Sequence, residues 1–291
     1  MASATKTING KLFVRSILDG SPAAQAGLQV GDQLLSADNK PFHPIQSFAG
    51  KAGQSVKLRI QRSPTPDSQR DLAVTPKLLD ATSMFLDAQK ASTKIIPQNG
   101  KRIGYMHIWS YAGDQYQEQL EEDLIYGRLK NADGLVLDLR EGWGGAPLTA
   151  LNIYSKQRDL NITSIPRSGK PYTSYAQWNK PVVMLVNEGS RSAKEILAFG
   201  FQQYQIGPVV GTKTAGAVVA GTSFLMKDGS LLYVAVANVF VNGNQRLEGK
   251  GVTPDVVVPF SLEYAEGADP QKDKAIAVLL ESLQPGKSSE Q

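Results

Sequence analysis

From residue 101 onward the sequence alternates short apolar segments with segments of helical periodicity, and this alternation constrains the fold most strongly. Two apolar runs, 134–138 and 181–186, have the length and continuity of strands that are buried on both faces. Segments with helical spacing lie at 114–131, 148–154, 192–204 and 269–283. Strands that alternate with helices form parallel sheets, so the sequence predicts an α/β domain.

The N-terminal part of the chain has a different pattern. Residues 11–17, 31–35, 56–61 and 71–74 are typical of strands, and Ser21, Pro22 and Gly27 mark the cap, first turn and end of a short helix. A chain of 291 residues suits two domains. We therefore expect a small β-rich domain at 1–78, a linker with a short helix at 79–100, and a larger α/β domain at 101–291 whose C-terminal part is rich in strands.

Composition excludes several kinds of site. The chain has no cysteine, so it has no disulfide, thiol nucleophile or thiolate metal site, and its two histidines, His43 and His107, lie far apart in sequence. The net charge of +4 is mild and the basic residues are scattered, which gives a nucleic-acid role no support. No apolar run approaches the ~20 residues that span a bilayer. The first residues lack the apolar core of a signal peptide, so we expect such a signal to be absent or already removed.

Residues 187–196 join an apolar strand to the start of a helix through a turn that contains Gly189. Free backbone amides and the positive end of the helix would meet at Ser192, which favours a developing oxyanion and a serine nucleophile. The alternative is a capping box formed by Ser192 and Glu195, and Ser190 is a second possible cap. Taken alone, this segment favours capping.

Residues 138–145 also follow an apolar strand and end in two adjacent glycines, Gly144 and Gly145. Adjacent glycines allow the backbone to approach a ligand closely or to adopt positive φ in a tight turn. The alternative interpretation is an ordinary strand-to-helix loop, which this segment alone favours.

Residues 20–32, Gly-Ser-Pro-Ala-Ala-Gln-Ala-Gly-Leu-Gln-Val-Gly-Asp, resemble the signature of bacterial PDZ domains. The resemblance implies a module that adds an extended C-terminal peptide to a sheet edge and holds the peptide carboxylate with backbone amides. In PDZ domains the carboxylate-binding loop usually precedes the strand expected here at 11–17. Only ten residues lie before that strand, so we expect the loop to be shortened or absent.

Several segments, in order, resemble the C-terminal processing peptidases, also called tail-specific proteases. Residues 138–145 resemble their Asp-Leu-Arg-x-x-x-Gly-Gly segment, and residues 189–196 resemble their Ser-x-Ser-x-x-Glu-Ile segment. Residues 228–232, 242–243 and 248–255 resemble their C-terminal strands. The resemblance covers residues 10–259 and implies the fold of these serine peptidases, preceded by a PDZ domain.

Carried over residue by residue, the resemblance implies that Ser192 is the nucleophile. It implies that the backbone N–H of Ala193, together with that of Gly144 or Gly145, forms the oxyanion hole. Each such donor lowers the barrier by roughly 3 kcal/mol. This chemistry needs no cofactor, and we expect none.

The chain departs from the family pattern at the general base. That base is a lysine in a Thr-x-Gly-Lys-Gly segment after the serine, and Ala217 stands at the corresponding position. A supporting glutamine is replaced by Gly221, and Gln203 stands where some members have a carboxylate. Since alanine accepts no proton, the sequence keeps the nucleophile and the oxyanion hole but lacks the usual base.

Three residues are candidates for a replacement base. His107, in the strand expected at 103–109, titrates near neutrality, and its alternative role is packing. Lys194 lies two residues beyond Ser192 on a helix, so we expect it to point to the other side and to be solvated. Lys213 lies just before the vacant position and is expected to be exposed.

Residues 212–217 also resemble retinoid-binding interphotoreceptor proteins and tricorn-type peptidases, which lack the lysine as well. Tricorn-type enzymes recruit a histidine from elsewhere, whereas the retinoid-binding members use the fold as a carrier. The sequence therefore predicts a serine endopeptidase acting on polypeptides or C-terminal peptides presented through the PDZ domain. The alternative is a catalytically inactive scaffold or carrier. Family members are often exported, so we expect a periplasmic or cell-envelope location.

Overall fold

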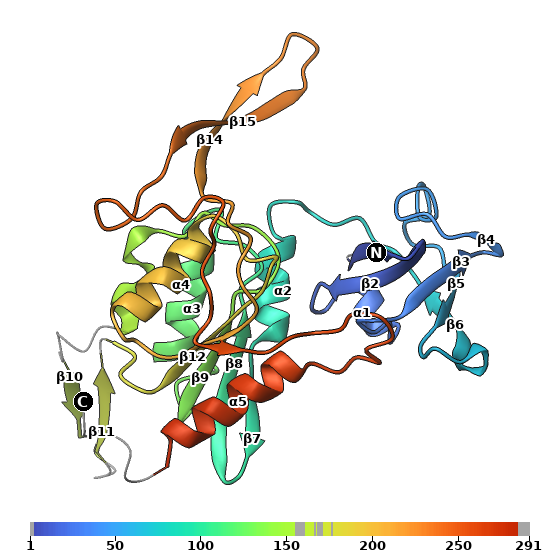
Figure 1. Ribbon diagram of the computed structural model, residues 1–291. Helices are drawn as coiled ribbons and strands as arrows, with labels where there is room; N and C mark the ends of the chain where they lie inside the picture. Colours follow the sequence, from blue (N-terminus) through green and yellow to red (C-terminus); the bar gives the residue numbers. More distant parts are fainter. Residues whose placement is uncertain (1–2, 155–160, 166, 168–170, 176, 285–291) are drawn as a thin grey trace. The chain divides into compact units, whose positions relative to one another are not determined.

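A computed structural model describes residues 3–154, 161–165, 167, 171–175 and 177–284 of the chain (Figure 1). The chain divides into two compact units, the first formed by residues 1–92 and 259–270 and the second by residues 93–258 and 271–291. The helix expected in a linker thus belongs to the first unit, and a late segment of the chain returns to it. The expected boundaries 1–78, 79–100 and 101–291 do not coincide with these units.

The first unit is built on an antiparallel sheet with the order β1-β2-β3-β5-β6, in which β4 pairs with β3. The strands expected at 11–17 and 56–61 are confirmed with those bounds. The β1–β2 hairpin turns at Asn9 and Gly10, whose φ angles of 50° and 74° are those of a two-residue turn that favours Asn-Gly. The elements are β1 (Ser3–Ile8), β2 (Lys11–Ile17), α1 (Pro22–Gln25), β3 (Gln33–Ala37), β4 (Lys40–Pro41), β5 (Val56–Gln61), the 3₁₀ helix η1 (Pro66–Ser68), β6 (Gln69–Val74) and α2 (Met84–Ser92).

Strand β1 occupies most of the residues before position 11. These residues form a strand paired with β2 from Ser3↔Ile17 to Ile8↔Lys11. The segment Ser-Ala-Thr-Lys-Thr-Ile has almost no apolar alternation, so only pairing with β2 identifies it as a strand. Because β1 stands at one end of the strand order, it is an edge strand of the described sheet.

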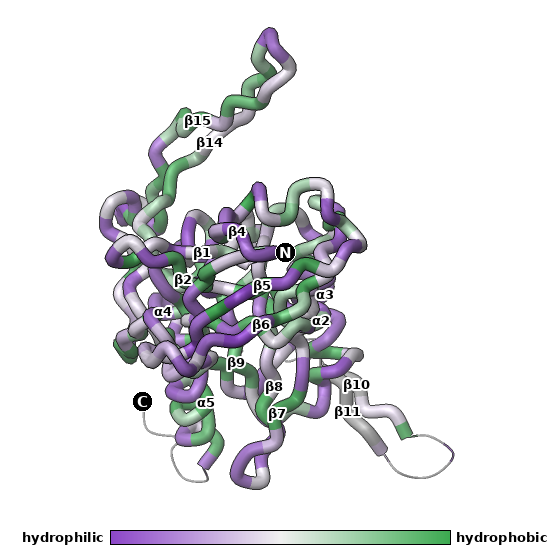
Figure 2. The backbone as a smooth tube through the Cα atoms, turned by 90° about the vertical axis from the view of Figure 1, so that its right-hand side faces the viewer, coloured by the Kyte–Doolittle hydropathy of each residue, from purple (hydrophilic) through white to green (hydrophobic). Residues whose placement is uncertain are grey.

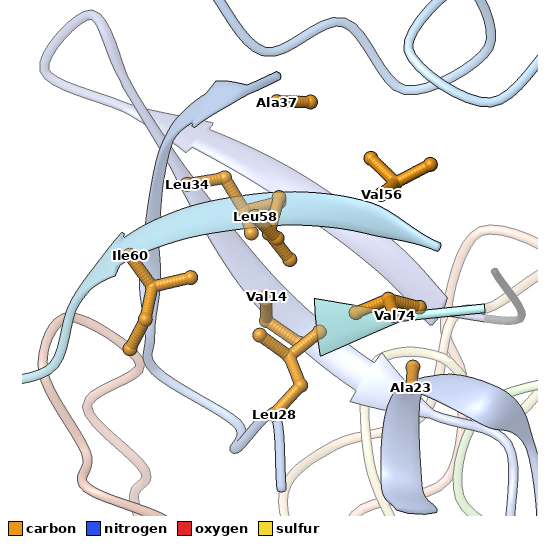
Figure 3. Close-up of a cluster of buried hydrophobic side chains, with 9 residues drawn as sticks. All are labelled: Val14, Ala23, Leu28, Leu34, Ala37, Val56, Leu58, Ile60 and Val74. Atoms are coloured by element: carbon orange, nitrogen blue, oxygen red, sulfur yellow. The ribbon is translucent and has the colours of Figure 1, made fainter. Parts of the chain in front are cut away.

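The first unit has its own apolar core, which Figure 3 shows between the strands and α1. Ser21 caps α1 in the ordinary way, with φ −71°, ψ 161° and its side chain accepting a hydrogen bond from the Ala24 N–H. The returning segment packs on the same unit, since the Tyr264 ring meets Phe13 edge-on at 5.1 Å. The core residues are Val14, Ala23, Leu28, Leu34, Ala37, Val56, Leu58, Ile60 and Val74.

The second unit contains a sheet with the order β16-β13-β12-β9-β8-β7, parallel except for the pairing of β7 with β8. This arrangement confirms the mixed α/β class expected from the sequence. The elements are β7 (Lys94–Gln98), β8 (Lys101–His107), α3 (Gln115–Ile125), β9 (Gly134–Asp138), η2 (Leu148–Tyr154), β10 (Asn161–Ser164), β11 (Tyr172–Tyr175), β12 (Val182–Val186), α4 (Ala193–Gln203), β13 (Val209–Gly211), β14 (Val219–Leu225), β15 (Leu231–Asn238), β16 (Val256–Val257) and α5 (Pro270–Ser282).

Both predicted apolar runs are central strands, and every residue of β9 and β12 is buried. Helix α5 packs on one face of the sheet through Ala275, Ile276 and Leu279, and Figure 1 shows α3 and α4 on the other side. Helix α3 ends at Ile125, before the expected 131, because the chain turns there and the Gly127 N–H bonds back to the Glu122 carbonyl. Residues 148–154 form a 3₁₀ helix in place of an α-helix.

Strands β14 and β15 form a hairpin whose two strands pair only with each other, and it stands away from the central sheet (Figure 1). Stretches of the hairpin are coloured as hydrophobic along the backbone tube in Figure 2, and Leu225, Leu231 and Tyr233 are 75%, 71% and 70% exposed. Within the described part of the chain, no helix combines the length and apolar character needed to cross a membrane.

Candidate active site

The site lies where three parallel strands of the second unit end. His107 is the last residue of β8 and pairs in register with Asp138, the last residue of β9. Asn187 follows β12, whose Leu185 also pairs with Asp138. Because parallel strands run the same way, these residues and the loops that follow them gather at one edge of the sheet, where open α/β sheets place their ligand sites.

Residues 187–192, here called the elbow, lead from β12 into α4, and Ser192 has φ 58° and ψ −130°. A capping box with Glu195 is present, as the capping interpretation predicts. Capping does not require this backbone, however, since an N-cap residue ordinarily has β-region angles, as Ser21 has. A non-glycine residue in this region costs about 1–3 kcal/mol, and such strain concentrates at functional sites.

The strain at Ser192 makes a prediction about stability. Ser192→Gly should be about 1 kcal/mol more stable than Ser192→Ala, because glycine relieves strain of about 1–3 kcal/mol and returns about 0.5–1 kcal/mol as unfolded-state entropy. Urea unfolding of both variants measures the difference. A Ser192→Ala variant that is about 0.5–1 kcal/mol more stable than Ser192→Gly, the entropy difference alone, would show that the backbone at this position is not strained.

Residues 141–145, here called the glycine loop, lie directly against Ser192. A Cβ atom on Gly144 would come within 2.5 Å of the Ser192 Cβ and 2.9 Å of both the Ser192 Oγ and the Ala193 nitrogen. Gly145 has φ +102°, which favours glycine. Among the described residues, no acceptor pairs with the N–H groups of Ala193, Gly144 or Gly145. The structure therefore brings together the four residues that the sequence predicts for the nucleophile and oxyanion hole.

Two polar residues that the sequence did not single out as functional fasten the elbow to Leu139 and to Glu141, the first residue of the glycine loop. The Ser190 hydroxyl, fully buried, donates to the Leu139 carbonyl at 2.9 Å. Asn187 exchanges two hydrogen bonds with Glu141, from its Nδ2 at 2.9 Å and to its Oδ1 at 3.2 Å. These hydrogen bonds fix the position of the elbow relative to the glycine loop. Only the position of these residues after apolar strands could have indicated this role.

Glu195 is a fully buried carboxylate on α4 that accepts four hydrogen bonds. Its Oε1 accepts from the Thr214 hydroxyl at 2.6 Å and the Gly216 N–H at 2.7 Å, and its Oε2 from the Ala217 N–H at 2.8 Å and the Ser192 N–H at 3.1 Å. The Ser192 N–H also points at the Ala217 carbonyl, 3.0 Å away. Residue 217 therefore lies beside the proposed nucleophile, and there it carries only a methyl group.

His107 is buried at the end of β8. Its Nε2 lies 2.9 Å from the Arg140 carbonyl, and its ring stacks on Trp109 at 4.0 Å. In the described structure no hydrogen bond joins His107 to Ser192, and these contacts favour packing. Burial alone would raise the pKa of the neighbouring Asp138, but the charges of Arg140 and His107 and hydrogen bonds from Arg140 hold that pKa well below its usual range.

The expectation that Lys194 is solvated is wrong. Its side chain is fully buried, and its Nζ donates to the carbonyls of Ile108 at 2.7 Å, Trp109 at 3.3 Å and Glu141 at 2.7 Å. Helical spacing directs this side chain away from Ser192, but that side of α4 faces the glycine loop and not water. Lys213 is exposed, as expected.

A cavity of about 320 Å³ opens beside Ala193. One wall is α4, and most of the lining side chains are apolar. A side chain that enters it would lie next to Ala193. The lining includes Pro147, Leu151, Ala193, Ile196, Leu197, Gly200, Phe240 and Val241.

Comparisons with known proteins agree with this architecture. The model of a PDZ domain matches residues 13–62, and the model of peptidase family S41 matches residues 102–258. Tricorn protease homolog 1 of Streptomyces coelicolor is 32% identical and aligns with 91% of this chain and 25% of its own length. The carboxyl-terminal-processing protease of Synechocystis sp. is 28% identical and aligns with 92% of this chain and 65% of its own length.

A crystal structure of the tricorn protease matches 97% of this chain and 29% of that protein, with 22% identity and a TM-score of 0.54, which is a likeness of fold. The chain spans less than two thirds of the length of both sequence relatives. The resemblance to C-terminal processing peptidases with a PDZ domain is nevertheless confirmed. Since the S41 model covers more than half of the chain, the protein belongs to peptidase family S41.

Proposed function

We propose that this chain is the PDZ and catalytic part of a serine endopeptidase, with Ser192 as the nucleophile. The observation that carries the proposal is a strained Ser192 that lies against Gly144 and next to Ala193, whose N–H groups pair with no acceptor among the described residues. The Ser192 Oγ would attack the scissile carbonyl carbon. The carbonyl oxygen would take its negative charge toward the N–H of Ala193 and that of Gly144 or Gly145.

The proton on the Ser192 hydroxyl needs an acceptor, and Ala217 supplies none. His107 is the candidate within this chain, although its Nε2 contact with the Arg140 carbonyl supports packing. His107→Gln decides between these roles by the rate of Ser192 acylation at one fixed pH. A base at His107 predicts a loss of about 10²–10⁴-fold with the stability of the chain unchanged, and a packing role predicts a loss of stability with no such loss of acylation in the molecules that remain folded.

The first unit would present the substrate. Edge strand β1 offers backbone groups to which an extended peptide can add, the mode of recognition that PDZ domains use. The expected partners are therefore unfolded or C-terminally exposed polypeptides, and we propose a periplasmic or cell-envelope location. The domain assignment that accompanies this proposal is a peptide-binding domain at 1–78 and a peptidase domain at 101–291.

The cavity beside Ala193 gives the proposal a testable preference. A peptide with leucine on the acyl side of the scissile bond should be cleaved with a kcat/KM at least tenfold above that of its aspartate counterpart, because the cavity offers apolar contact and no cation. Mass spectrometry of cleavage products from a peptide library measures this, with Ser192→Ala as the control. Equal cleavage of both peptides would show that this cavity does not select the side chain on the acyl side of the scissile bond.

The alternative function is a non-catalytic scaffold or carrier. The observation that favours it is the methyl group of Ala217 beside Ser192, where the family places its base. A scaffold would bind polypeptides through the first unit without cleaving them. Peptide binding without turnover or acylation, in a folded chain, would select this alternative.

A further inference from the structure

Lys194 is the one lysine among the described residues whose side chain is completely buried, and its three hydrogen bonds go to backbone carbonyl oxygens on neighbouring segments. It donates to Ile108 and Trp109, which follow β8, and to Glu141, the first residue of the glycine loop. Three acceptors match the three protons of an ammonium group, whereas a neutral amine has only two. The site therefore suits a charged lysine, and its protons are directed away from Ser192.

The carbonyls that bind Lys194 belong to the first residue of the glycine loop and to the segment after β8 that contacts this loop. The Trp109 carbonyl also accepts the Trp143 N–H at 2.8 Å, and the Gly144 carbonyl accepts the Tyr111 N–H at 3.2 Å. A Cβ atom on Gly142 would come within 1.8 Å of the Trp109 carbonyl oxygen, so these backbones are in direct contact. Lys194 thus joins α4, the end of β8 and the glycine loop at one point.

We propose that Lys194 is a positioning residue that fixes the glycine loop against α4, and that it does so only as the ammonium ion. The consequence of this role for catalysis rests on the proposed function of the Gly144, Gly145 and Ala193 N–H groups. The effect of Lys194 on the position of the glycine loop is independent of that function. Lys194 contacts no reacting atom. Its role is to hold the N–H of Ala193 and that of Gly144 or Gly145 at a fixed separation.

The surroundings make the charge of this ammonium sensitive to pH. Burial lowers the pKa of Lys194 to about 7, which Asp138 and Glu141 oppose and Arg191 reinforces. Above that pH the amine loses one of three hydrogen bonds, so the loop should loosen. The free energy of unfolding should rise over the same range, up to the ordinary lysine pKa of 10.5, because there the unfolded chain binds more protons. The titratable and charged groups around the site are His107, Asp138, Arg140, Glu141, Arg191 and Glu195.

Amide hydrogen exchange tests the proposal without requiring enzymatic activity. The probes are the Trp143 and Tyr111 N–H groups, whose acceptors are the Trp109 and Gly144 carbonyls. In the unaltered chain their protection, corrected for intrinsic exchange, should fall about tenfold between pH 6 and pH 8.5. In Lys194→Met the protection of both N–H groups should equal, at both pH values, the lower protection that the unaltered chain has at pH 8.5.

Lys180→Met is the matched control. Lys180 also donates to two backbone carbonyls, those of Lys130 at 3.0 Å and Ala132 at 2.7 Å, and burial also lowers its pKa. This variant should leave Trp143 and Tyr111 protection and its pH dependence unchanged. Protection in Lys194→Met equal to that of the unaltered chain, or pH dependence that persists in Lys194→Met, would overturn the proposal. If Lys194→Met does not fold, the unaltered chain is sufficient for the test. Protection of its Trp143 and Tyr111 N–H groups that does not change between pH 6 and pH 8.5 would overturn the proposal.

A kinetic readout then tests the link to catalysis. Lys194→Met should lower kcat for peptide cleavage at least tenfold at pH 6 with little change in KM, since the oxyanion hole acts in the transition state. Loosened exchange with unchanged kcat would refute the catalytic role of the loop while leaving the positioning role in place. Absence of turnover in the unaltered chain would count against the proposed function, and the exchange measurement would still decide the role of Lys194.

Discussion

Replacing Gly144 with alanine should lower the rate constant for acylation of Ser192 by about 10²–10³-fold, the loss expected for one oxyanion-hole donor. The reason is steric. The added Cβ would lie 2.5 Å from the Ser192 Cβ and 2.9 Å from the Ala193 nitrogen, so the glycine loop must move away from Ser192 and from the Ala193 N–H, the second proposed donor. The rate of inactivation by a fluorophosphonate measures this directly.

Gly104→Ala is the control for that experiment. Gly104 likewise has no positive φ, and its added Cβ would meet the Ala132 Cβ and the Gly134 carbonyl oxygen at 3.2 Å in the central sheet. It should change the acylation rate less than threefold, because the loss of an oxyanion-hole donor needs a displaced loop. An acylation rate in Gly144→Ala within threefold of the unaltered chain would show that close approach at this glycine is not needed.

Replacing Glu195 with glutamine should destabilise the second unit by about 2–4 kcal/mol. Each carboxylate oxygen accepts two hydrogen bonds, and an amide nitrogen at either place would face two donors. The change also weakens the link that Glu195 makes between the N–H groups of Ala217 and Ser192. The rate of Ser192 acylation should therefore fall together with the stability. The midpoint of urea unfolding measures the first effect.

Glu188→Gln provides the comparison. Glu188 lies on the elbow but is exposed, and it accepts a hydrogen bond from the Thr212 hydroxyl at 3.1 Å. Its substitution should change stability by less than about 0.5 kcal/mol. Similar losses for the two variants would mean that the four donors around Glu195 find other partners.

Sequence patterns identified those parts of the fold that follow from local composition. The apolar runs of β9 and β12 could be recognised because strands buried on both faces need apolar residues throughout. Family motifs predicted the positions of Ser192 and Gly144. The structure added the strained backbone of Ser192 and the close approach of Gly144 to it. Strand β1 was not evident, because its polar residues become a strand only when β2 supplies the pairing.

The role of Lys194 could not be predicted for a similar reason. A lysine on a helix of unknown neighbours is expected in water, since burying its charge is costly. Three carbonyls that come from segments more than 50 residues earlier in the chain make its burial possible. In the sequence Glu195 stood out as a helix cap and as part of the family motif at 189–196, and three of its four donors are known only from the fold.

Labelling of the chain with a fluorophosphonate, followed by identification of the modified residue by mass spectrometry, tests directly whether Ser192 is a nucleophile. A nucleophile at Ser192 predicts one phosphonylated residue, Ser192, and no label in a folded Ser192→Ala variant. Label that persists in Ser192→Ala, or a folded native chain that takes no label, would contradict the assignment of Ser192 as a catalytic nucleophile.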